Sequence, residues 1–143
     1  MRKLLIALFL AASPAAATTA DIVMHRDPGC GCCEAWAAQV TKSFGRAVRI
    51  VDIVDRGGIR RAAGMPAGLG SCHTALSGGM AFEGHVPIGD MKRVLAERPK
   101  GVSGLAVPGM PIGSAGMEVA GRAADRYTVF AFGANNSRRF ASY

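Results

Sequence analysis

Three cysteines, Cys30, Cys32 and Cys33, stand within four positions of the chain in the stretch DPGCGCCEAW, and Cys72 is the fourth cysteine of the sequence. Three thiols this close cannot all pair with one another. They could form a redox dithiol with additional thiols, part of a disulfide framework, or a set of metal ligands. Four cysteines allow three pairings, and a bridge between the neighbours Cys32 and Cys33 would be strained. We therefore expect part of this cluster to carry chemistry rather than only to stabilise the fold.

The flanking residues place the cluster at the start of a helix. Residues 21–25 are apolar and partly β-branched, which predicts a short strand that Asp-Pro-Gly then ends. After the cysteines, Trp36, Val40 and Phe44 recur every four residues up to Gly45, which predicts an amphipathic helix. Free N–H groups and the positive end of the helix dipole favour thiolate over thiol. Thiolate is both the nucleophile and the metal-ligating form of cysteine.

The remaining segments alternate between predicted strands and helices. In order, the sequence predicts a buried strand over 46–54, a helical turn near 59–63, a hairpin over 73–86 with its turn at Gly78-Gly79, a short helix from Pro87 to just before Pro99, a loop over 101–121, a strand over 125–133 and a polar tail over 134–143. This order, with Cys30 and Cys33 in C-x-x-C spacing after the first strand, is typical of the thioredoxin-like fold. The predicted fold class is α/β, a thioredoxin-like single domain with a small mixed sheet flanked by helices.

Composition indicates one packed domain without a nucleic-acid partner. The chain has 143 residues, of which 50% are hydrophobic and 19% charged. Its formal net charge is +7, and without Arg2 and Lys3 it is +5, from 15 basic and 10 acidic residues. The arginines are scattered and match no nucleic-acid-binding motif. We interpret the basic charge as a solvated surface.

The first 20 residues have the layout of a secretory signal. A short basic start precedes an apolar run over 4–12, and small residues follow it. The run is too short to span a bilayer as a permanent helix, and cleavage after Ala17 or Ala20 fits the small-residue pattern. The sequence therefore predicts a signal peptide over 1–20 and an exported domain over 21–143 with no stable membrane span.

Four motifs in chain order, DPGCGCCEAW, MPAGLGSCHTA, EGHVP and GLAVPGMPIGSAGME, resemble one family over about 21–143. This is the family of small exported, thioredoxin-like metal-binding proteins, long catalogued as a domain of unknown function and found with bacterial copper-resistance genes under the name CopG. The resemblance implies a redox-active periplasmic copper-binding protein that contributes to copper resistance. It implies a copper site at Cys30, Cys32 and Cys33 that could hold a multinuclear cluster, and it matches Cys72 to the cysteine of the SCH motif.

The chemistry of the residues supports copper independently. Soft thiolate and thioether ligands select Cu(I). Structural zinc sites usually use two separated cysteine pairs, so zinc is the less favoured metal here. Two further ligand candidates are His85 and His73, since imidazole binds copper. The loop methionines Met110 and Met117 are candidates either for copper ligation or for guiding copper into the site, because their thioethers are soft ligands. His73 directly follows Cys72, and on a strand alternation would turn it away from the partners of Cys72.

Two functions of different classes follow. The first is a copper-binding protein that sequesters, carries or changes the oxidation state of copper, with copper ions and other periplasmic copper-handling proteins as partners. The second is a thiol–disulfide oxidoreductase that uses Cys30 and Cys33, with Cys32 or Cys72 as the resolving thiol. The C-x-x-C spacing favours the second. The two additional thiols and the methionine-rich loop favour the first, and whether the protein is a copper or a thiol–disulfide enzyme stays open at this point.

Overall fold

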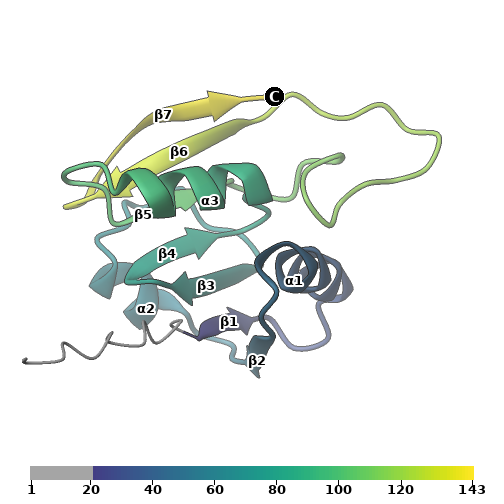
Figure 1. Ribbon diagram of the computed structural model, residues 1–143, viewed down its shortest axis with the longest axis horizontal. Coiled ribbons are helices and arrows are strands. Elements are labelled where there is room, and N and C mark those ends of the chain that lie inside the picture. The colour runs from purple at the N-terminus through teal and green to yellow at the C-terminus, as the bar shows by residue number, and fades with distance from the viewer. Residues whose placement is uncertain (1–20) are drawn as a thin grey trace, which may run out of the picture.

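One mixed sheet of seven strands organises the structure, a computed structural model that describes residues 21–143 (Figure 1). The predicted signal peptide over 1–20 lies outside the described residues. The elements are β1 (Ile22–Arg26), α1 (Gly31–Phe44), β2 (Val48–Asp52), α2 (Gly57–Ala62), β3 (His73–Ser77), β4 (Met80–Glu83), α3 (Ile88–Glu97), β5 (Gly104–Ala106), β6 (Thr128–Gly133) and β7 (Asn136–Ser142). The strand order is β2-β1-β3-β4-β5-β6-β7, with β1–β2 and β4–β5 parallel and the other pairs antiparallel.

Strand alternation divides the apolar residues between the two faces of the sheet. On one face, Met24 of β1 and Phe82 of β4 pack in the same core cluster as Trp36 of α1. Figure 1 shows α1 and α3 together over this face. On the other face, Ala81 of β4 belongs to a smaller cluster against which Ala63, after α2, packs. The molecule is thus a single α/β domain with helices on both faces of the sheet.

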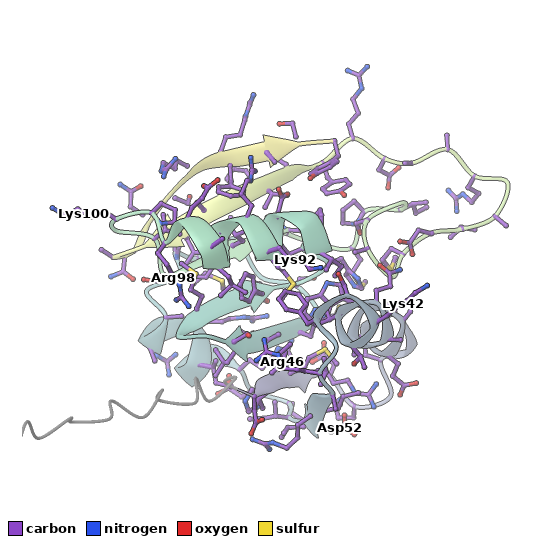
Figure 2. All side chains as sticks on the ribbon, in the orientation of Figure 1. Lys42, Arg46, Asp52, Lys92, Arg98 and Lys100 are labelled. Atoms are coloured by element: carbon purple, nitrogen blue, oxygen red, sulfur yellow. A yellow bond between two sulfur atoms is a disulfide. The ribbon has the colours of Figure 1, made fainter. Side chains whose placement is uncertain are left out.

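Helix α1 carries the cysteine cluster on its first turn. Cys30 holds the N-cap position, and Gly45 ends the helix in a left-handed conformation with φ of 66°, which glycine adopts without a Cβ clash. At that end lies Lys92 of α3, which Figure 2 labels. Its Nζ is 5.5 Å from the centroid of the Phe44 ring. The helix that the periodicity predicted is therefore confirmed, and it begins early enough to include Cys32 and Cys33.

The central hairpin and the following helix also form as predicted. Gly78 and Gly79 join β3 to β4, and both have positive φ, as the tight turn of a two-residue hairpin requires. Helix α3 follows Pro87 and ends at Glu97, with Arg98 as its C-cap just before Pro99. In the part of the chain that the structure describes, no helix has both the length and the apolar character needed to cross a membrane.

Three expectations about the sheet were wrong. Strand β2 is an edge strand rather than a buried one, and Ile50 at its centre is 39% exposed. The loop expected over 101–121 contains the three-residue strand β5, which is too short to give a pattern. The expected polar tail forms β7, which pairs with β6 through a turn at Ala134 and Asn135, both with positive φ. Because β7 is an exposed edge strand, its polar composition resembled that of a tail.

Candidate metal centre

Four sulfur atoms meet at the N-terminus of α1. The Sγ atoms of Cys30, Cys32, Cys33 and Cys72 all lie within 4.8 Å of one another. Cys30 and Cys33 form a disulfide, while Cys32 and Cys72 are free thiols. The Cys32 Sγ lies 3.4 Å from that of Cys30, and the Cys72 Sγ lies 3.4 Å from that of Cys33. The fold therefore brings the distant Cys72 to the predicted cluster.

Two buried histidines extend the group beyond the sulfurs. His85 and His73 have no exposed surface, and their ring nitrogens lie within 4.8 Å of the Cys72 Sγ and of each other. The His85 Nε2 is 3.2 Å and the His73 Nδ1 is 3.5 Å from this sulfur. Cys72 is thus shared by a four-sulfur group and a cysteine–histidine group.

His73 does not point away from the partners of Cys72, as strand alternation had suggested. Strand β3 begins at His73, so Cys72 lies before the strand and does not follow its alternation. The His73 ring packs against Trp36, with centroids 4.6 Å apart, and meets His85 edge-on at 5.1 Å. The Trp36 Nε1–H donates to the carbonyl of Val86 at 3.0 Å, which fixes the indole beside the His73 ring.

Both imidazoles are held in the neutral form, which is the form that binds metals. Burial, His85 and Arg56 lower the pKa of His73 to about 3. Burial is also the main cause that lowers the pKa of His85. In neutral His85, Nδ1–H donates to the carbonyl of Ala115 at 2.8 Å, because a carbonyl can only accept. The Nε2 lone pair therefore faces the sulfur of Cys72, as in a metal-ligating histidine oriented by a backbone carbonyl.

The Cys72 thiol resists ionisation when no cation is near. Burial, followed by the neighbouring Cys32, raises its pKa to about 11. A bound cation would favour the thiolate, since opposite charge at short range stabilises the ionised form. This combination of a buried thiol, neutral imidazole and nearby sulfurs fits a soft metal such as Cu(I).

Two arginines attach the cysteine-bearing turn to the rest of the domain. Arg26 Nη1 donates to the carbonyl of Cys30 at 2.9 Å and pairs with Glu34 at 2.7 Å. Arg56 Nη1 pairs with Asp27 at 2.6 Å, and its Nη2 donates to the carbonyl of Ser71 at 3.1 Å. These contacts connect the segment before α1 to the segment that carries Cys72.

The methionine-rich loop lies against the same centre. Met110 lines an opening of about 340 Å³ together with Cys72, and its side chain is 54% exposed. Met117 follows Gly116, whose backbone packs closely on α1. A Cβ added to Gly116 would lie 2.6 Å from the backbone nitrogen of Trp36. The structure thus places Met110 on an opening that Cys72 also lines, and Met117 directly after the residue that packs on α1.

Sequence reasoning missed the polar residues that support the centre. Glu83 is fully buried, and its carboxylate accepts a hydrogen bond from the backbone N–H of Ser71. Arg60 forms an ion pair with the same carboxylate. A glutamate within the largely apolar run of the predicted hairpin was a usable signal, because a charge that becomes buried needs a partner. The identity of the partner was not readable, because α2 and β4 meet only in the folded chain.

Comparison with known proteins identifies the group to which the chain belongs. Residues 69–117 match a family model described as a protein of unknown function, DUF411, and no curated protein matches. Two solved structures, titled copper resistance protein CopG form 1 and form 2, are each 35% identical to this chain. Each match covers 87% of this chain and 98% of the solved chain, with TM-scores of 0.76 and 0.75. The chain therefore belongs to the CopG family of copper resistance proteins.

Proposed function

We propose that this protein binds copper in the periplasm through its cysteine and histidine centre and contributes to copper resistance by holding Cu(I) and converting Cu(II) to it. The observation that carries the proposal is the position of Cys72, whose sulfur lies within ligand reach of Cys33 and of His85. One shared sulfur between two ligand groups suits a bridge between copper ions. The titles of the two similar structures point to the same metal.

The state of Cys30 and Cys33 decides how many ligands are available. While they form a disulfide, their sulfurs are not thiolates, and only Cys32 and Cys72 can ligate as thiolates. Reduction of the disulfide by two electrons and two protons gives four thiols. The reduced form is therefore the one with the larger copper capacity, and this makes copper binding dependent on redox state.

The same pair can supply electrons to copper. Two thiols that form one disulfide release two electrons and two protons, and two Cu(II) ions accept these electrons to become two Cu(I) ions. Cys30 and Cys33 are placed for this step, since they already form the disulfide. An external dithiol then reduces the pair again by disulfide exchange. Cu(I), as a soft ion, stays on the remaining sulfurs and the imidazoles.

The loop and the export signal complete the proposal. Met110, at the opening that it lines with Cys72, offers a thioether to arriving Cu(I), and Met117 is a candidate ligand from the covering loop.

The signal-like start of the chain supports export to the periplasm. The order β1-α1-β2-α2-β3-β4-α3 with strands β2-β1-β3-β4 side by side supports a thioredoxin-like core for this part.

Anaerobic titration of the reduced protein with Cu(I) against a competing chelator tests the proposal. We expect more than one tightly bound copper per chain in the wild type and loss of this binding in the triple variant C30S/C32S/C33S. Met80→Leu is the matched control, because it removes a buried sulfur outside the centre. A wild-type protein that retains no copper against the chelator contradicts the proposal.

A thiol–disulfide oxidoreductase is the second candidate, and the Cys30–Cys33 disulfide in C-x-x-C spacing favours it. This function needs only the two cysteines of that disulfide. It is tested by the rate at which the protein, supplied with a dithiol, reduces a disulfide-containing test protein. Rapid reduction that persists in C72S and occurs without copper retention would favour this candidate over copper binding.

A further inference from the structure

A buried carboxylate from the opposite face of the sheet supports the segment that carries Cys72. Glu83, the last residue of β4, has no exposed surface. Its Oε1 accepts a hydrogen bond from the backbone N–H of Ser71 at 2.7 Å, and its Oε2 accepts one from the hydroxyl of Thr74 at 2.5 Å. The two contacts lie on either side of Cys72 and its neighbour His73, so one side chain fixes both ends of this short segment.

An arginine from α2 closes the arrangement. The NH2 group of Arg60 pairs with the Glu83 carboxylate and donates to the carbonyl of Ser71 at 2.8 Å. Both backbone groups of Ser71 therefore have charged partners. The Ser71 hydroxyl donates in addition to the carbonyl of Gly109, at 2.5 Å, in the loop that leads to Met110.

Close packing prevents the segment from moving toward β4. Gly84 has φ of 69°, and a Cβ at this position would lie 2.6 Å from the Ser71 side chain and 2.5 Å from the carbonyl of Val107. Its N–H donates to the carbonyl of His73 at 2.8 Å. Ser71, Cys72 and His73 are thus held by backbone contacts as well as by the carboxylate.

Stability alone does not account for this charge. Replacing a buried ion pair by apolar side chains often leaves a protein equally or more stable. What the pair does provide is a defined conformation for the backbone just before Cys72, because its charged side chains bind both the N–H and the carbonyl of Ser71. That backbone determines where the shared sulfur lies.

We infer that Glu83, with Arg60, is a positioning residue for the copper centre: it holds the Cys72 sulfur at the distances from Cys33 and His85 that copper ligation requires. The inference rests on the proposed copper function for its consequence, but the position of the sulfur can be measured without copper. Glu83 itself touches none of the candidate ligand atoms and acts through the backbone of Ser71 and the side chain of Thr74.

The chain contains a matched control. Asp90 in α3 is also a buried carboxylate that pairs with an arginine, Arg93, and accepts from a hydroxyl, that of Tyr143. It shares an arginine and a hydroxyl partner with Glu83 but lacks the backbone N–H partner that Ser71 supplies to Glu83, and none of the partners named for it belongs to the segment around Cys72. Glu83→Ala and Asp90→Ala therefore each remove a buried carboxylate with an arginine and a hydroxyl partner, one at the centre and one away from it.

The experiment measures the position of the sulfur by cross-linking. In the full chain carrying C30S and C32S, the remaining thiols are Cys33 and Cys72, whose Sγ atoms lie 3.4 Å apart. Limited oxidation with diamide joins them, and loss of free thiol gives the rate. We expect Glu83→Ala to slow this rate by about 10-fold or more, comparable to the loss of metal affinity when a residue that orients a ligand is removed, and Asp90→Ala to leave it unchanged.

Conservative variants separate positioning from general loss of stability. Glu83→Gln keeps an acceptor for Ser71 and a polar contact to Thr74 while it loses the charge opposite Arg60, so it should recover most of the cross-linking rate. If Glu83→Ala does not fold, Arg60→Met serves instead, since Arg60 is partly exposed; we expect an intermediate rate. A folded Glu83→Ala, or Arg60→Met in its place, that cross-links as fast as the parent overturns the inference.

Copper binding gives the second measurement. In the chain with all four cysteines, Glu83→Ala should weaken Cu(I) binding by about 10-fold and alter the copper–thiolate absorption, while Asp90→Ala should change neither. If the wild type retains no copper but Glu83→Ala still slows cross-linking, the proposed function fails and the positioning role stands. Unchanged copper affinity in Glu83→Ala, with copper bound normally by the wild type, contradicts the positioning role.

Discussion

The two sides of the candidate centre differ in what surrounds their ligand atoms. We name them the helix arm, which comprises Cys30, Cys32 and Cys33 on the first turn of α1, and the sheet arm, which comprises Cys72, His73 and His85 beside β3 and β4. In the helix arm, Cys30 and Cys32 are partly exposed and Cys33 is buried. In the sheet arm, the two histidines have no exposed surface and Cys72 is 9% exposed.

This difference assigns the arms different tasks. An exposed cysteine at a helix N-terminus can exchange disulfides and electrons with partners, because both access and the helix dipole favour thiolate chemistry. A buried thiol with neutral imidazoles beside it cannot easily reach a partner, but it offers donors at fixed positions. Under the proposed function, redox exchange would therefore belong to the helix arm and the geometry of copper binding to the sheet arm.

Removal of the shared sulfur should have the largest effect on the centre. Cys72→Ser takes one ligand from both groups, whereas Cys32→Ser takes one from the four-sulfur group alone. We expect Cys72→Ser to weaken Cu(I) binding by about 1,000-fold or more, beyond the ~10–100-fold typical of residues outside the ligand set. Competition with a Cu(I) chelator measures both variants, and equal losses would contradict a special role for Cys72.

The two free thiols of the oxidised protein should differ in reactivity. With its pKa raised to about 11 by burial, Cys72 is thiolate in only about one molecule in a thousand at pH 8. Cys32 is partly exposed. We expect iodoacetamide to modify Cys32 about 100-fold faster than Cys72, as read by mass spectrometry of peptides over time. Denaturant should remove the contrast, and similar rates in the folded protein would argue against the division into arms.

The same contrast explains which parts of the centre the sequence could predict. The helix arm is local: the cysteine spacing and the period of Trp36, Val40 and Phe44 suffice to place three sulfurs at a helix start. The sheet arm depends on contacts between distant segments. The resemblance to the family singled out Cys72 and His85, but alternation misjudged His73 because the start of β3 could not be located to one residue. The supporting role of Glu83 could not be predicted, because it depends on the contact between Arg60 of α2 and Glu83 of β4, which exists only in the folded chain.

Fold prediction succeeded and failed for similar reasons. The α1 helix and the β3–β4 hairpin have strong local signals, an apolar period in one and the Gly78-Gly79 turn in the other. Strand β2 is rich in β-branched residues, which indicates a strand but not whether it lies at the edge of the sheet. Strand β7 carries Arg138 and Arg139 on an exposed edge, where charged side chains protect against unwanted pairing, and such a strand has the composition of a tail.

A smaller loss is expected when one imidazole is removed from the sheet arm. His85→Gln removes the Nε2 atom that faces the Cys72 sulfur at 3.2 Å, and we expect Cu(I) affinity to fall by about 30-fold. His25→Gln is the matched control, since His25 is half-buried on β1 and points to the face opposite Met24. The same chelator competition measures both, and a loss confined to His25→Gln would refute the assignment.

The smallest effect concerns the stability of the metal-free protein at mildly acidic pH. The pKa of His73 is lowered to about 3, chiefly by burial, from the 6.5 of an exposed histidine. Between these values the unfolded chain binds more protons than the folded one. The contribution of neutral His73 is therefore complete above pH 6.5 and is lost as pH falls toward 3. One such group gives a slope of at most about 1.4 kcal/mol per pH unit.

Urea unfolding of the copper-free protein at pH 7, 6 and 5 measures this slope above the range in which most carboxylates titrate. In His73→Phe the ring that packs on Trp36 is retained and the titrating group is lost, so the free energy of unfolding should depend less on pH. His85, whose pKa is also lowered by burial, should preserve part of the slope. An identical slope in wild type and His73→Phe would mean that His73 protonates without disturbing the fold, and the sheet arm would then be less rigid than its burial implies.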